Sequence, residues 1–174
     1  AAIPIAFQVD RVLDVMRSAE GFVAVERTIE STYVKDYDAI ELPREWSRFD
    51  TSKWILLAAY ADHRRAGGAI VVLDSSGIEL LEGRSDLAVL WDLRVAPECR
   101  GQGIGTALFR AAEALAVARG GRELKVETQN VNVPACRFYQ RHGCVLRAVN
   151  RFAYPELPDE IQLLWVKSLT TAGR

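Results

Sequence analysis

Up to about residue 95, the hydrophobic and polar positions of the chain follow a strand pattern. The short runs GFVAVERTIE, WILLAAYADH, GGAIVVLD and DLAVLWDLRV are rich in β-branched and aromatic residues. Turn signals such as RRAGG and DSSG separate several of these runs. The pattern predicts an antiparallel meander of strands in this half of the chain.

After residue 95 the apolar period becomes helical. Apolar residues recur at the spacing of one helix face, and the pair Gly120-Gly121 ends the pattern. This segment is predicted to be an amphipathic helix. Its apolar positions are Ile104, Leu108, Ala111, Leu115 and Ala118.

The remaining segments alternate between strand and helix patterns. RELKVET alternates like a strand, and VPACRFYQRH places Ala135, Phe138 and His142 on one helix face. Pro134 falls in the first turn of that helix and Gly143 just beyond its end. Two strand-like runs, CVLRAVN and EIQLLWVKSL, follow. The order predicts a mixed α/β (α+β) fold with one central, mostly antiparallel sheet flanked by helices.

The N-terminal region has no single period. In VDRVLDVMRSA, the residues Val9, Val12, Leu13 and Met16 lie at helical spacing. STYVKDYDAIELPREWSRF mixes aromatic and acidic residues without a regular period. We therefore predict a loop-rich region there.

Composition limits the domain organisation and the partners. With 174 residues, 49% of them hydrophobic, residues 1–174 are expected to form a single domain. The formal net charge of -1, from 22 basic and 23 acidic residues, argues against nucleic acid or a membrane surface as a partner. No apolar run approaches the roughly 18 residues that cross a bilayer, and no secretion signal is evident, so we expect a cytoplasmic protein.

The cysteines and histidines form neither a disulfide nor a metal pattern. Cys99, Cys136 and Cys144 are odd in number and lack a CxxC pair, and His63 and His142 lie far apart in the sequence. We therefore expect neither a disulfide framework nor a metal site.

A glycine-rich loop, APECRGQGIG, joins the strand that ends at Val95 to the predicted helix. A helix N-terminus carries unpaired N–H groups and partial positive charge, and glycine lets a ligand approach the backbone closely. This predicts a phosphate-binding loop at Gly101, Gly103 and Gly105, although a tight turn or close helix–strand packing explains the glycines equally well. Thr106-Ala107 after the last glycine excludes a Walker loop, and the even glycine spacing disfavours a dinucleotide fingerprint.

Two motifs resemble those of the GNAT acetyltransferases. LRVAPECRGQGIGTALFRAAEALA is similar to the acetyl-coenzyme A motif of that family, with Arg100, Gly103 and Gly105 in the fixed places of R/Q-x-x-G-x-G/A. NVPACRFYQRHGCV is similar to the family segment N-x-x-A-x-x-F/L-Y-x-x-x-G-F, with Cys144 in place of the usual Phe. Together they span about residues 87–150, the expected coenzyme-binding core.

The resemblance implies a GNAT-type domain with splayed central strands and acetyl-coenzyme A as co-substrate. The N–H of Leu93 would polarise the thioester carbonyl, and the backbone of Leu93 and Val95 would bind the pantetheine arm. Asn132 would contact the coenzyme, or cap a helix, or do both. The residues expected to hold the pyrophosphate are Arg100, Gly101, Gln102, Gly103, Gly105 and Thr106.

Tyr139 matches the family's general acid, which offers a proton to the leaving thiolate; without the resemblance, core packing is the ordinary role of such a residue. Many relatives carry an acid on the strand before the loop, where this chain has Asp92 beside Trp91. Alternation predicts that these two side chains point to opposite faces, so Asp92 is either the base or a structural acid paired with an arginine. Glu127, the pair Asp159-Glu160 and a water chain are further candidates for the base.

The acceptor is predicted from the C-terminal stretch NRFAYPELPDEIQLLWVKSL, which resembles the tail of the streptothricin acetyltransferases. Such enzymes acetylate an amino group on the β-lysine part of a cationic antibiotic. Direct transfer is expected, because no histidine lies near Cys99 in sequence to activate it as an acyl carrier. Acetylation of a protein N-terminus or lysine, and a coenzyme-binding module without turnover, are the alternatives.

Several acids offer contacts to a small cationic amine, or else a solvated surface. Members of this family often dimerise, and no residue of this chain requires it. The residues expected at the acceptor site are Trp91, Glu127, Asp159 and Glu160, with Asp36, Asp38, Glu41 and Glu156 as further acids.

Overall fold

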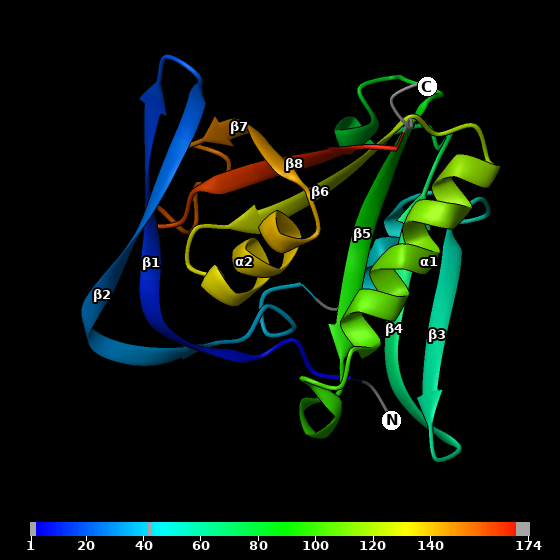
Figure 1. Cartoon of the computed structure of the whole chain (residues 1–174), viewed down its shortest axis with the longest axis horizontal. Helices are drawn as coiled ribbons and strands as arrows, with labels where there is room; N and C mark the ends of the chain where they lie inside the picture. The colour runs from blue at the N-terminus through cyan, green and yellow to red at the C-terminus, as the bar shows by residue number, and fades with distance from the viewer. Residues whose placement is uncertain (1–2, 42, 170–174) are drawn as a thin grey trace. The chain divides into compact units, whose positions relative to one another are not determined.

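The computed structural model describes residues 3–41 and 43–169 (Figure 1). The chain divides into two compact units. The first unit comprises the residues up to Ile5, Tyr37–Lys125 and the residues from Ser168, and the second comprises Ala6–Asp36 and Val126–Lys167.

The two units contain the following elements. The first holds η1 (Pro43–Arg48), β3 (Ile55–Ala61), β4 (Arg64–Val72), η2 (Glu79–Leu81), β5 (Leu87–Val95), η3 (Pro97–Cys99) and α1 (Ile104–Ala118). The second holds β1 (Phe7–Ser18), β2 (Gly21–Lys35), α2 (Val133–Arg141), β7 (Val145–Asn150) and β8 (Gln162–Ser168) except for its last residue. β6 (Glu123–Gln129) begins in the first unit and ends in the second.

Six strands form one sheet in the order β3-β4-β5-β6-β8-β7, and β1 and β2 form a separate two-stranded sheet. The pairs β3–β4, β4–β5 and β7–β8 are antiparallel. The predicted mixed α/β fold with a central sheet and flanking helices is therefore confirmed. The predicted meander holds for β3, β4 and β5.

In the first unit, α1 packs against β3, β4 and β5 (Figure 1). Gly67 permits this close contact, because a Cβ there would lie 2.9 Å from Leu108 Cδ1 and 3.1 Å from Ile104 Cγ2. The buried face of α1 is rotated from the predicted one, since Ala111 and Ala118 are exposed. The buried residues of α1 are Leu108, Phe109, Ala112 and Ala116.

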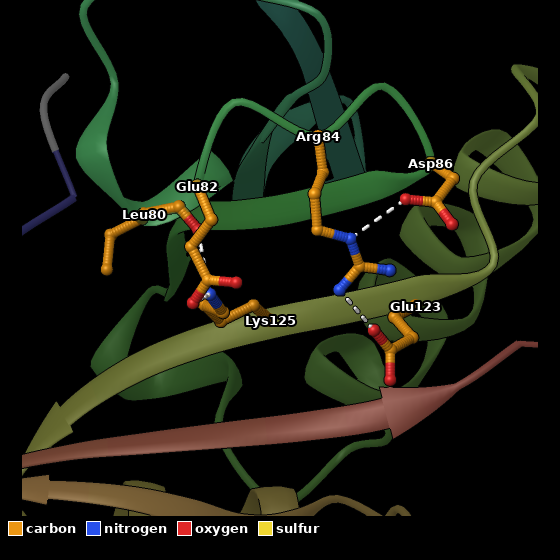
Figure 2. Close-up of polar contacts among 6 residues, drawn as sticks. All are labelled: Leu80, Glu82, Arg84, Asp86, Glu123 and Lys125. Atoms are coloured by element: carbon orange, nitrogen blue, oxygen red, sulfur yellow. Dashed lines mark hydrogen bonds and ion pairs between the residues drawn. The ribbon is translucent and has the colours of Figure 1, made fainter.

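A polar cluster fixes the loop between β4 and β5 to the start of β6 (Figure 2). The ammonium group of Lys125, whose side chain is only 5% exposed, donates to Leu80 O at 2.9 Å and pairs with Glu82 Oε1 at 2.6 Å. The Arg84 guanidinium bridges Asp86 and Glu123 in the same way. The buried lysine charge is thus fully paired, as burial requires.

The second unit corrects two predictions. GFVAVERTIE belongs to β2 and pairs with β1, so it is not part of the meander. VDRVLDVMRSA is strand rather than loop. A register shift between Val9 and Arg11 interrupts the side-chain alternation, so that Val9 and Val12 are buried in the same cluster. This irregularity imitates helical spacing in the sequence.

The region predicted to be loop-rich contains regular structure as well. Its first residues complete β2, which ends at Lys35, and Pro43–Arg48 form the short helix η1. Between these two elements, residues 36–41 form neither strand nor helix. No helix in residues 3–41 and 43–169 is long and apolar enough to span a bilayer.

Candidate active site

The glycine loop presents open backbone at the start of α1. Gly101 and Gly103 have φ angles of 76° and 84°, which residues with a Cβ rarely adopt. A Cβ on either residue would meet no protein atom within 4 Å, so backbone conformation rather than packing requires glycine here. Two side chains order the loop: Arg100 Nε donates to Val95 O at 3.2 Å, and Gln102 Nε2 donates to Glu98 O at 3.1 Å.

Gly103 is the N-cap of α1 and has no side chain with which to cap it. Intrahelical bonding starts with Ala107 N, which donates to Gly103 O at 2.9 Å. The first turn carries no acidic residue. A helix leaves its first N–H groups without intrahelical acceptors and carries partial positive charge at that end. Gly105 and its neighbours in the first turn therefore fit an anionic ligand such as a pyrophosphate.

The backbone N–H and C=O groups of β5 point alternately toward β4 and away from it. Ala96 follows the last residue of β5, and its N–H points toward β4, where it donates to Ala66 O at 2.8 Å. In the antiparallel register, Arg94 lies opposite Gly68 and Leu93 opposite Ala69. Because hydrogen-bonded pairs alternate with non-bonded pairs, the N–H and C=O groups of Leu93 and Val95 point away from β4. The bond from Arg100 Nε to Val95 O agrees with this direction.

A β-bulge lies at the predicted site residues of β5. Ile70 pairs with Asp92 and Val71 pairs with Leu90, which leaves Trp91 as an extra residue. A bulge resets the alternation of side chains. Trp91 packs against the same buried cluster as Ile70, and Ile70 is the residue that pairs with Asp92, so Trp91 and Asp92 lie on one face of the sheet. The prediction that Trp91 and Asp92 point to opposite faces is wrong for this reason.

Asp92 is bound by an arginine. Arg94 Nε donates to both oxygens of Asp92, at 3.0 and 2.9 Å. Arg94 Nη1 donates to both oxygens of Asp38 at 2.8 Å and to Ile3 O at 3.2 Å. Burial raises the pKa of the Asp92 carboxyl, and the charge of Arg94 offsets part of that rise. The arrangement matches the interpretation of Asp92 as a structural acid paired with an arginine.

Trp91 belongs to an aromatic cluster. The centroid of its ring lies 4.8 Å from the ring centroid of Trp54, 5.4 Å from that of Phe49 and 6.2 Å from that of Trp46. Trp46 and Trp54 also line a cavity of about 340 Å³. Trp91 itself does not line this cavity, so its contacts are those of a packing residue.

Tyr139 and Asn132 are both positioned by α2 in the second unit. Tyr139 is buried, with 7% of its surface exposed. Asn132 is the N-cap of α2, and its Oδ1 accepts from Ala135 N at 3.2 Å. The expected capping role of Asn132 is therefore present. The most buried residues of α2 are Val133, Cys136 and Tyr139, whereas Ala135, Phe138 and His142 are half-buried.

Glu127 lies in a polar network that sequence reasoning did not identify. Tyr154 donates its hydroxyl proton to Glu127 Oε1 at 2.5 Å, and Gln162 Nε2 donates to Glu127 Oε2 at 2.9 Å. Gln129 Nε2 donates to the Tyr154 hydroxyl at 2.9 Å. Burial, followed by the charge of Glu127, raises the pKa of Tyr154. The sequence signal for this network is that Glu127 and Gln129 lie two positions apart in a strand and therefore share one face.

Several of the other predicted acids have cationic partners. Glu160 is buried and forms an ion pair with Lys35, and Glu41 pairs with Arg48. Asp159 is exposed. Burial raises the pKa of Tyr33, and the negative charges of Glu160 and then Asp159 raise it further.

The cysteines are free. Cys136 and Cys144 are buried, and Cys99 is half-buried in the glycine loop region. Burial raises the pKa of the Cys136 thiol to about 11. Within residues 3–41 and 43–169, no group of His, Cys, Asp and Glu is arranged to hold a metal ion.

Comparison with known proteins identifies the family. Residues 22–144 match the acetyltransferase (GNAT) family. The chain is 30% identical to the streptothricin acetyltransferase of Escherichia coli over 162 residues, which covers 91% of this chain and 83% of that protein. It is also 30% identical to streptothricin acetyltransferase A of Bacillus subtilis (strain 168) over 112 residues, covering 62% of this chain but slightly less than two thirds, 65%, of that protein.

A solved structure agrees with the sequence relatives. The crystal structure of a nourseothricin acetyltransferase superposes with a TM-score of 0.75 at 28% identity, covering 97% of this chain and 90% of that one. The match to the family model covers more than half of the chain and includes the glycine loop and α2. The chain therefore belongs to the GNAT acetyltransferase family, whose members are acyltransferases with acetyl-CoA as co-substrate.

Proposed function

We propose that this chain transfers the acetyl group of acetyl-CoA to a primary amine of a small cationic acceptor, with residues 1–174 acting as one catalytic domain. The acceptor amine that fits best is that of a β-lysine moiety, as in streptothricin. The similarity to the E. coli streptothricin acetyltransferase carries this proposal, because it covers 91% of the chain and extends well beyond the coenzyme motifs.

The first unit supplies the groups for the co-substrate. The N-terminal turn of α1, with Gly101, Gly103 and Gly105, binds the pyrophosphate through backbone N–H groups. The N–H of Leu93, which points away from β4, donates to the thioester carbonyl oxygen as negative charge grows there. Asp92 orients Arg94, and Arg94 in turn joins β5 to Asp38 and Ile3.

The reaction is a direct transfer in a ternary complex. The amine nitrogen attacks the thioester carbonyl carbon, a C–N bond forms and the C–S bond breaks. The amine loses one proton to solvent, and the leaving sulfur gains one. Tyr139, whose phenol matches the family's acid, gives its proton to the sulfur, which avoids release of a bare thiolate, and the phenolate then regains a proton from solvent.

The test is thiol release from acetyl-CoA with streptothricin, spermidine, lysine and a set of peptides as acceptors. Streptothricin is expected to give the highest kcat/KM. Tyr139→Phe should lower kcat by about 100-fold or more, the usual contribution of a general acid. Tyr60→Phe is the matched control, because Tyr60 is 68% exposed on β3.

Three results would contradict the proposal in different ways. Higher kcat/KM with peptides would make the chain a protein acetyltransferase. Stabilisation by acetyl-CoA without turnover of any acceptor would make it a coenzyme-binding module. An unchanged kcat for Tyr139→Phe would remove the acid role from Tyr139.

A further inference from the structure

The Glu127 carboxylate is fixed at both oxygens by neutral donors. Oε1 accepts from Tyr154 and Oε2 accepts from Gln162 Nε2. The direction of the tyrosine proton is determined, because the same hydroxyl accepts from Gln129 Nε2 and must donate to Glu127. The carboxylate is therefore held in one orientation before any ligand binds.

Among the described residues, no Lys, Arg or His lies within ion-pair distance of the Glu127 carboxylate. Within residues 3–41 and 43–169, Asp92 pairs with Arg94 and Glu160 pairs with Lys35, whereas Glu127 forms no ion pair. A half-buried carboxylate without a cation is costly, and a cationic ligand would offset that cost. Each carboxylate oxygen can accept more than one hydrogen bond, so acceptor capacity remains for the N–H groups of an ammonium.

Glu127 also lies on a defined face of β6. The hydroxyl of Thr128, its neighbour, contacts Cys136 Sγ of α2 at 3.3 Å, so Thr128 faces α2. Alternation along the strand places Glu127 and Gln129 on the opposite face. The carboxylate is thereby separated from Tyr139, which is carried by α2.

We propose that Glu127 is the anionic subsite that binds a protonated amine of the acceptor, and that Tyr154 is the positioning residue that orients it. This inference rests on the proposed function for its substrate class, a small cationic amine. Tyr154 fixes Oε1 and Gln162 fixes Oε2, so the geometry of the subsite depends on the segment between β7 and β8 and on β8 itself.

The experiment measures binding and turnover in parallel. Binding of streptothricin is measured by calorimetry, and kcat and KM for streptothricin and for acetyl-CoA are measured by thiol release. The variants are Glu127→Gln, Tyr154→Phe and the double variant, with Tyr60→Phe as the control for loss of a tyrosine hydroxyl.

Glu127→Gln should weaken streptothricin binding by about 100-fold, because one partner of a charged pair is removed. Tyr154→Phe should weaken it by about tenfold, the usual strength of a hydrogen bond to a charged group. The double variant should be no weaker than Glu127→Gln alone, because Tyr154 acts only through Glu127. KM for acetyl-CoA should stay unchanged in all of them.

Equal streptothricin binding by wild type and Glu127→Gln would overturn the inference, and so would additive losses in the double variant. A change in the KM for acetyl-CoA would also overturn it, because the effect would then be a general structural one. If wild type binds streptothricin through Glu127 but transfers no acetyl group, the inference stands and the proposed function fails.

Discussion

Replacement of Gly67 by Ala tests how closely α1 must approach the sheet. The added Cβ would lie 2.9 Å from Leu108 Cδ1, 3.0 Å from Arg94 O and 3.1 Å from Ile104 Cγ2. The carbonyl oxygen of Arg94 belongs to β5 and cannot rotate away. The helix must therefore move outward, starting at its first turn, which contains Ile104.

Overpacking by one methyl group costs about 1 to 3 kcal/mol. For a domain of this length, that corresponds to a fall in Tm of about 3 to 10 °C. The first turn of α1 also carries the N–H groups assigned to the pyrophosphate, so KM for acetyl-CoA should rise while KM for the acceptor stays the same. Differential scanning fluorimetry and steady-state kinetics measure the two effects.

Gly68→Ala is the matched control, because Gly68 is the next residue of β4 and its side-chain direction is opposite. A Cβ there would meet Arg65 Nη2 at 2.7 Å, which is the flexible end of a side chain, and Leu57 O at 3.2 Å. Its fall in Tm should be smaller, and KM for acetyl-CoA should not change. Equal effects of the two substitutions on KM would refute the reasoning that α1 must lie against Gly67.

Two other predictions concern α2. Asn132→Ala should lower the unfolding free energy by about 1 kcal/mol in urea titrations, because the N-cap bond to Ala135 N is lost, whereas Asn132→Asp should keep that stability. Burial raises the pKa of the Cys136 thiol from 9.0 to about 11, so the unfolded chain loses this proton first as pH rises. Between these two pH values, wild type should lose about 2 to 3 kcal/mol of stability relative to Cys136→Ala, and parallel pH profiles of the two proteins would contradict this.

The sequence alone identified the elements whose signals are local. The helices at Ile104–Ala118 and Val133–Arg141 follow from apolar spacing and from Asn132 and Gly143 at the two ends of α2. The glycine loop was predicted from its glycines, the residue type that adopts positive φ angles most readily, and Gly101 and Gly103 do adopt them. Such features depend on neighbours within one or two helical turns, so the printed order of residues contains the necessary information.

The tertiary structure decided the features that depend on pairing between distant segments. The register shift after Val9 explains why the apolar residues of strand β1 have helical spacing in the sequence. The bulge at Trp91 places Trp91 and Asp92 on one face. The bond between Glu127 and Tyr154 joins residues 27 positions apart. Side-chain periodicity assumes an unbroken ladder and names no partner, so it determined which residues could reach the site but not which of them meet.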